Sequence, residues 1–171
     1  MNTVKIDLCG LPDELRSGLE KLCMHEGFRS GTDGIRLSAR RGGAFSAEFD
    51  GQTLRVEYCE PVQFFRALSY LKRADHRRFA LHRQPVFEHN GVMLDCSRNA
   101  VPRVETVKMV LRKMALMGLN TLMLYTEDTY EVPEQPYFGY LRGRYSVEAL
   151  RGLDSYAAAL GIELVPCIQT L

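Results

Sequence analysis

The sequence has no long hydrophobic run. Acidic or basic residues interrupt every apolar segment, so none approaches the ~20 apolar residues that a membrane-spanning helix needs. The N-terminus also lacks the apolar core of about 7–15 residues that marks a secretory signal. These absences argue against a membrane-spanning or secreted chain, and we expect a soluble, cytoplasmic protein with no membrane partner.

An excess of charge of one sign is also missing. Lysines and arginines number 22 and acids 21, which gives a net charge of +1, whereas nucleic-acid-binding domains usually carry a clear basic excess. The basic stretch 72–83 could bind phosphate, but bases are also favoured at the negative C-terminal end of a helix and in a solvated linker. We therefore expect no nucleic-acid partner.

Cysteines are few and scattered. The chain has five, and no two have the spacing of a metal-binding knuckle. An odd, dispersed set is typical of free thiols in a reducing cytosol. Cys96 and Cys167 come late in predicted strands, where we expect small buried hydrophobes. We expect neither a metal nor any other cofactor.

Hydrophobic residues make up 46% of the sequence, enough for a globular core. The hydrophobic pattern of residues 1–75 predicts a small α+β domain with the element order β-α-β-β-β-α. Its helices begin near Pro12 and Pro61, because proline is favoured in the first turn of a helix. Residues 76–89 predict a basic linker, and the hydrophobic pattern changes in residues 90–171.

Turn dipeptides divide the middle of the first domain. Gly42-Gly43 predicts a hairpin between strands at 35–39 and 44–49. Asp50-Gly51 predicts a second turn, before an alternating strand at 53–58.

The second part has a different hydrophobic pattern. Its strands are apolar without alternation, which is typical of parallel sheets covered on both faces. Pro102 leads into one amphipathic helix and Ser146 caps another, while Gly118 and Gly161 end them. The order β-α-β-α-β implies parallel strands with right-handed crossovers. The predicted strands are 91–94, 121–125 and 162–165.

The third of these strands is the last element before Leu171. A three-stranded parallel sheet would leave an apolar edge and one open face. We therefore expect the front of a larger protein, truncated after the third strand, with self-association through the exposed half-barrel as an alternative.

Polar residues follow each of these strands, where α/β proteins place their working groups. Arg98 offers a rigid fork of donors suited to the vicinal hydroxyls of a sugar or to a carboxylate. It could instead form a structural salt bridge with Glu127 or Asp128. Those two acids are adjacent, so on an extended backbone they point apart and do not form an acid/base pair. The three clusters are 95–99, 126–131 and 169–170.

The connection at 124–145 is long and rich in aromatic residues. Most such connections in α/β units have only ~2–6 residues. Tyr130, the other tyrosines and Phe138 could form a wall on which a sugar stacks, or the packed interior of the loop. We expect this loop to lie over a binding site.

The run GVMLDCSRNAVPRVETVKMVLRKMALMGLNTLMLYTEDTYEV resembles the start of the barrel of glycoside hydrolase family 20, the β-N-acetylhexosaminidases. Its G-x-x-L-D-x-S-R part matches their first barrel strand. Residues 90–171 carry the resemblance, and residues 1–75 resemble more loosely the small α/β domain that precedes the barrel. The resemblance implies the first three strands of a (β/α)8 TIM barrel.

The resemblance also implies an activity. Family 20 enzymes remove terminal β-linked N-acetylglucosamine or N-acetylgalactosamine by substrate-assisted, retaining catalysis. Arg98 matches the family arginine that holds the sugar hydroxyls. We expect a carbohydrate substrate, with Arg98, Glu127, Asp128 and Tyr130 as substrate-binding residues.

The sequence departs from the family pattern at three points. The catalytic Asp-Glu pair belongs to a fourth strand, the second-strand motif lacks its tryptophan, and the third-strand motif stops before its histidine. We therefore expect no catalytic residue in this chain and no activity from it alone. The alternative is a stand-alone carbohydrate-binding or assembly module without catalysis.

Overall fold

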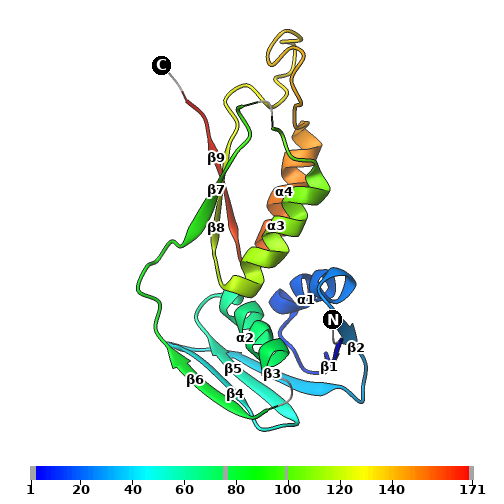
Figure 1. Ribbon diagram of the computed structural model, residues 1–171, viewed down its shortest axis with the longest axis vertical. Helices are drawn as coiled ribbons and strands as arrows, with labels where there is room; N and C mark the ends of the chain where they lie inside the picture. The colour runs from blue at the N-terminus through cyan, green and yellow to red at the C-terminus, as the bar shows by residue number, and fades with distance from the viewer. Residues whose placement is uncertain (1–2, 75–76, 99, 170–171) are drawn as a thin grey trace.

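The computed structural model describes residues 3–74, 77–98 and 100–169, which form a six-stranded sheet followed by a three-stranded sheet (Figure 1). Helices α1 and α2 lie between the first sheet and the ends of α3 and α4. The strands are β1 (Val4–Asp7), β2 (Phe28–Ser30), β3 (Ile35–Arg41), β4 (Phe45–Phe49), β5 (Thr53–Tyr58), β6 (Phe79–Arg83), β7 (Gly91–Asp95), β8 (Thr121–Tyr125) and β9 (Glu163–Cys167). The helices are α1 (Asp13–His25), α2 (Pro61–Arg73), α3 (Val104–Met117) and α4 (Val147–Ala158).

The first sheet is mixed, with the strand order β2-β1-β3-β5-β4-β6. The predicted hairpin between the strands at 35–39 and 44–49 is wrong, because β5 lies between β3 and β4. The tight hairpin is instead β4–β5, where Asp50 Oδ1 accepts hydrogen bonds from the backbone N–H groups of Gln52 and Thr53. Gly51 takes a φ of +100° there, which favours glycine. The dipeptide Gly42-Gly43 does lie between two strands, but it does not indicate which strand pairs with β3.

Strands β2 and β6 were not predicted. Strand β6 lies inside the segment 76–89 that was interpreted as a linker, and it pairs antiparallel with β4. Phe79 packs against Phe49 with ring centroids 5.9 Å apart. Exposed His82 and Arg83 occupy the free edge, where charge discourages pairing with another chain. The first sheet therefore includes part of the basic segment, and the domain limits at 75 and 89 stay a prediction.

The second sheet confirms the predicted β-α-β-α-β unit. Its strands are parallel in the order β7-β8-β9. Helix α3 ends at Gly118, which has a left-handed φ of +76°, and Ser146 Oγ caps α4 by accepting a hydrogen bond from Ala149 N at 3.1 Å. Met93 on β7 is 55% exposed. Self-association through the sheet face that exposes Met93 stays a prediction.

No helix among the described residues is both long and apolar enough to cross a membrane.

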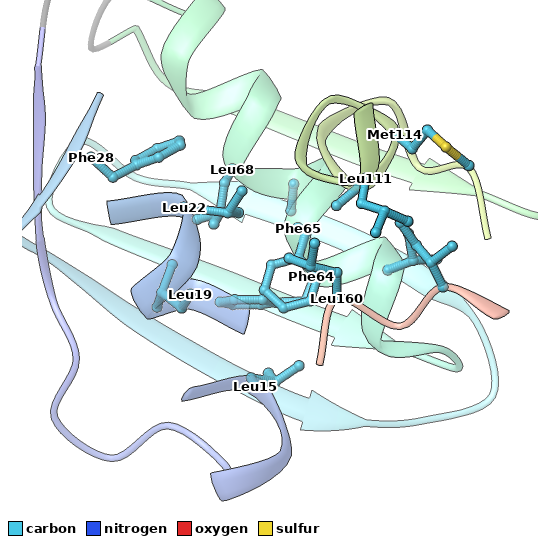
Figure 2. Packing of buried hydrophobic residues seen from close by; sticks show 14 of the residues in the cluster. Leu15, Leu19, Leu22, Phe28, Phe64, Phe65, Leu68, Leu111, Met114 and Leu160 are labelled. Atoms are coloured by element: carbon cyan, nitrogen blue, oxygen red, sulfur yellow. The ribbon is translucent and has the colours of Figure 1, made fainter. Parts of the chain in front are cut away.

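One hydrophobic core joins the two sheets. Figure 2 shows Leu19 and Leu22 of α1 and Phe65 of α2 near Leu111 of α3 and Leu160. Helix α1 approaches closely at Gly18, where a Cβ would collide with the carbonyl oxygen of Ala159 and the ring of Phe65.

Replacing Gly18 with alanine is expected to lower the free energy of unfolding by about 1–3 kcal/mol, because an overpacked core forces its neighbours to shift. The matched control is Gly152→Ala in α4, where a Cβ meets nothing within 4 Å. That change should be neutral or stabilise the fold by up to ~1 kcal/mol, since alanine is the better helix former. Urea unfolding followed by circular dichroism measures both variants. Equal stabilities for the two would show that α1 does not pack as closely as described.

Candidate functional site

The carboxyl ends of β7, β8 and β9 meet at one edge of the second sheet. Their register places Asp95, Tyr125 and Cys167 in one row. Leu122 and Leu124 alternate with Tyr125 and are buried toward the helices, so this row belongs to the opposite face. The polar strand ends therefore come together as predicted, although two of their members, Asn99 and Thr170, lie outside the described residues.

Arg98 and Glu127 form an ion pair across this edge. Arg98 Nη1 lies 3.3 Å from both Oε1 and Oε2 of Glu127. The Arg98 side chain is 73% exposed, whereas Glu127 is 23% exposed. Ion pairs so open to water contribute little to stability. The pair therefore orients an accessible guanidinium rather than holding the fold together.

The turn that carries Glu127 has a strained backbone. Glu127 has a φ of +50°, and the left-handed conformation costs a residue with a side chain about 1–2 kcal/mol. The fully buried Thr129 closes the turn, because its N–H and its Oγ1 both donate to the Thr126 carbonyl, at 2.9 and 2.7 Å. Thr126 N in turn donates to the Cys167 carbonyl at 3.0 Å. The hydrogen bond to the end of β9 therefore helps to stabilise the strained turn.

Asp128 points to a different partner from Glu127. Its Oδ1 lies 2.9 Å from Nη1 of Arg142, which lies near the C-terminal end of the long loop. Arg142 Nη2 also donates to the carbonyl of Ser97. The two adjacent carboxylates thus diverge, as predicted, but they do so because the chain turns at Glu127 and not because it is extended.

Tyr125 belongs to this site and was not among the predicted site residues. Its hydroxyl donates to Gln169 Oε1 at 2.7 Å. Loss of solvent contact and the Glu127 carboxylate raise the pKa of Tyr125 above its ordinary value. Beside it, hydrogen bonds from the Ser97 hydroxyl and N–H hold the pKa of Asp95 below its usual range. The pairing of Tyr125 with Asp95 in a parallel register was the signal that could have identified it.

The long loop packs partly on itself. Tyr145 is buried and donates to the Pro102 carbonyl at 2.6 Å, and burial raises its pKa. Figure 1 shows the loop, yellow to orange, continuing past the carboxyl ends of the strands above the start of α4. Tyr137 and Leu141 at the far end of the loop are 82% and 90% exposed. Tyr145 thus belongs to the packed interior of the loop, and a wall of aromatic residues on which a sugar stacks stays a prediction.

Tyr130 packs against another residue of its own loop. Its ring packs against Phe138 with centroids 5.1 Å apart. It also lines an apolar cavity of about 420 Å³ with Leu124 and Leu150 on the helix side of the sheet. The predicted role of Tyr130 in substrate binding stays a prediction, and this placement does not support it.

The buried thiol beside the site is a poor nucleophile. Cys96 is fully buried, and loss of solvent raises its pKa. Within the described residues no three histidine, cysteine or acidic side chains gather so that they could hold a metal ion.

No protein-family model matches the chain, and no curated protein matches it either.

Comparison by structure finds family 20 enzymes. An exo-β-N-acetylglucosaminidase of that family from Vibrio harveyi, solved in complex with N-acetylglucosamine, is similar with a TM-score of 0.72 and 19% identity, over 96% of this chain and 32% of that one. The β-N-acetylhexosaminidase from Bacteroides fragilis gives 0.68 and 18% over 97% and 40%. The family 20 enzyme from Streptomyces coelicolor gives 0.66 and 17% over 96% and 41%.

These matches confirm the predicted resemblance at the level of fold. The two sheets together correspond to part of family 20 structures, and the chain spans about a third to two fifths of their length. At this identity the likeness concerns the fold alone.

Proposed function

We propose that these residues form the N-terminal portion of an exo-acting β-N-acetylhexosaminidase. The enzyme removes terminal β-linked N-acetylglucosamine or N-acetylgalactosamine with retention of configuration. The observation that carries the proposal is the accessible guanidinium of Arg98, oriented by Glu127 at the carboxyl edge of the sheet. Active sites of β/α barrels lie at this edge, and the similar Vibrio harveyi enzyme was solved with N-acetylglucosamine.

Arg98 supplies the binding chemistry. Among the described residues, Glu127 engages its Nη1, which leaves Nε and Nη2 to donate to two neighbouring hydroxyls. A guanidinium is planar and permanently charged, so its donors keep one geometry at every working pH. Hydrogen bonds from a charged donor are about twice as strong as neutral ones. Arg98 thus fixes the terminal sugar without taking part in proton transfer.

The bond-breaking step uses groups outside these residues. In substrate-assisted catalysis the acetamido oxygen of the sugar attacks the anomeric carbon while a carboxylic acid protonates the leaving oxygen. The Asp-Glu pair that serves this step in family 20 belongs to a fourth barrel strand. Glu127 and Asp128 are each paired with a different arginine and point to different partners, so they do not form an acid/base pair. This region therefore binds, and hydrolysis requires the rest of the barrel.

The proposal is tested on the native protein, captured from its source cell with an antibody against this region. We expect it to release nitrophenol from the nitrophenyl β-N-acetylglucosaminide and not from the matching β-glucoside. The glucoside lacks the acetamido group that performs the attack, so it is a control for the mechanism as well as for the sugar. The 171-residue chain alone should hydrolyse neither compound. Equal turnover of both compounds by the native protein, or turnover of neither, would refute the proposal.

A further inference from the structure

Arg142 bridges the two turns of the candidate site from outside the sheet, whereas among the described residues the backbone joins them only up to the bond from Cys96 N to the Tyr125 carbonyl at 2.9 Å. It lies 45 positions from Ser97 in the sequence, yet its Nη2 donates to the Ser97 carbonyl and its Nη1 lies 2.9 Å from Asp128 Oδ1. Its side chain is only 23% exposed. One guanidinium thus bridges the turn after β7 and the turn after β8.

The positions of these contacts matter. Ser97 directly precedes Arg98, and Asp128 directly follows Glu127. The exposed pair of Arg98 and Glu127 is too weak to fix the separation of its own turns. A mostly buried guanidinium loses less to water, and its charged hydrogen bond and ion pair are correspondingly stronger. Arg142 therefore sets the distance at which Arg98 meets Glu127.

The loop is shaped to deliver Arg142. Gly139 has a φ of +63°, and a Cβ there would collide with the backbone carbonyl of Asp128. Arg142 N then donates to the Gly139 carbonyl at 3.1 Å, and the buried Tyr145 anchors the end of the loop. The close approach at Gly139 brings the loop backbone directly against the turn that Arg142 holds.

Few contacts hold the guanidinium itself. Arg142 Nε and Asp128 Oδ1 are both buried and have no hydrogen-bond partner among the described residues, so Arg142 and Asp128 attract each other by charge alone. This ion pair and the bond to Ser97 are the polar contacts of the guanidinium among those residues, one on each turn. Lysine, which presents a single charged nitrogen in place of a fork, would serve only one of them.

We propose that Arg142 is a positioning residue that holds Arg98 and Glu127 in the geometry that binds the terminal sugar. The substrate part of this inference rests on the proposed function, whereas the coupling of the two turns does not. The long loop therefore acts through its Arg142 on the strand ends, in addition to any contact that its aromatic residues make.

The first test needs no substrate. Amide hydrogen exchange is compared between the wild-type chain and Arg142→Met, with Arg144→Ala as the matched control, since Arg144 bonds the Phe138 carbonyl within the same loop. We expect exchange at Ser97 and at Thr129 to become at least tenfold faster in Arg142→Met and to stay unchanged in the control. If either turn keeps its wild-type exchange rate in a folded Arg142→Met chain, the proposal is overturned.

The second test is a kinetic cycle in the full-length protein. Arg142→Met should lower kcat/KM by about tenfold to a hundredfold, because a small misplacement of a binding group is costly, and Arg142→Lys should recover part of it. In an Arg98→Ala background the same change should have almost no further effect, because Arg142 acts through Arg98. Equal losses in both backgrounds would show a merely structural role. If the wild type shows no hexosaminidase activity, the proposed function fails, and the exchange test still decides whether Arg142 couples the turns.

Discussion

Replacing Glu26 with alanine should destabilise the fold by about 3–5 kcal/mol, the usual cost of removing one partner from a buried ion pair. The Glu26 side chain is 4% exposed at the end of α1, and it accepts hydrogen bonds from Arg112 Nε at 3.2 Å and Lys113 Nζ at 2.5 Å. Arg112 is itself 8% exposed. Its bond to the Tyr156 hydroxyl at 2.9 Å supplies no negative charge. The variant therefore leaves a buried guanidinium without a counter-charge.

Two further variants separate this effect from a general loss of packing. Glu20→Ala changes an exposed acid of the same helix and should alter the free energy of unfolding by less than ~0.5 kcal/mol. Adding Arg112→Met to Glu26→Ala should recover much of the loss, since apolar groups of similar volume can replace a buried ion pair at little cost. Urea unfolding measures all four proteins. A Glu26→Ala loss no larger than that of Glu20→Ala would show that the ion pair between the end of α1 and α3 does not stabilise the fold.

The two halves of the fold differed in how far the sequence predicted them. Strands β7 to β9 were predictable because each is a short apolar run and because Gly118 and Ser146 mark helix ends by local chemistry. The first sheet was not, since Gly42-Gly43 marks a turn and carries no information about which strand pairs with which. In β6 the alternation of Phe79 and Leu81 was obscured by the surrounding bases. Pairing between strands distant in the sequence is decided by the apolar surface that the whole sheet buries.

The candidate site shows the same division. Arg98 and Glu127 were predictable partners, because parallel strands bring their carboxyl ends together. The left-handed turn at Glu127 was not predictable, since Glu127 is neither a glycine nor an asparagine. Arg142 carried no spacing signal, because a loop folding back over 45 positions obeys no periodicity. Tyr125 was predictable, because it ends the strand predicted at 121–125 and parallel strands bring their ends together beside Asp95.

Replacing Arg98 with alanine should lower kcat/KM of the full-length protein by about 10²- to 10⁴-fold. Two hydrogen bonds from a charged donor are worth about 1.5–3 kcal/mol each, and each 1.36 kcal/mol corresponds to about tenfold in rate. Arg98→Lys keeps the charge but not the fork and should recover only part of the loss. Arg29→Ala, an exposed arginine of β2 on the first sheet, is the matched control and should leave kcat/KM unchanged.

Substrates that lack single hydroxyls can identify which hydroxyls Arg98 binds. Chromogenic substrates that lack one ring hydroxyl each are compared on the wild type and on Arg98→Ala. Removing a hydroxyl that Arg98 binds should lower kcat/KM of the wild type. The same removal should hardly change kcat/KM of Arg98→Ala, because the donor that binds this hydroxyl is already gone. If removing each hydroxyl lowers kcat/KM of Arg98→Ala by the same factor as that of the wild type, Arg98 does not touch the sugar, even when the variant is much slower than the wild type on the parent substrate. An unchanged kcat/KM for Arg98→Ala would refute its role outright, and the ion pair with Glu127 would then be an ordinary surface contact.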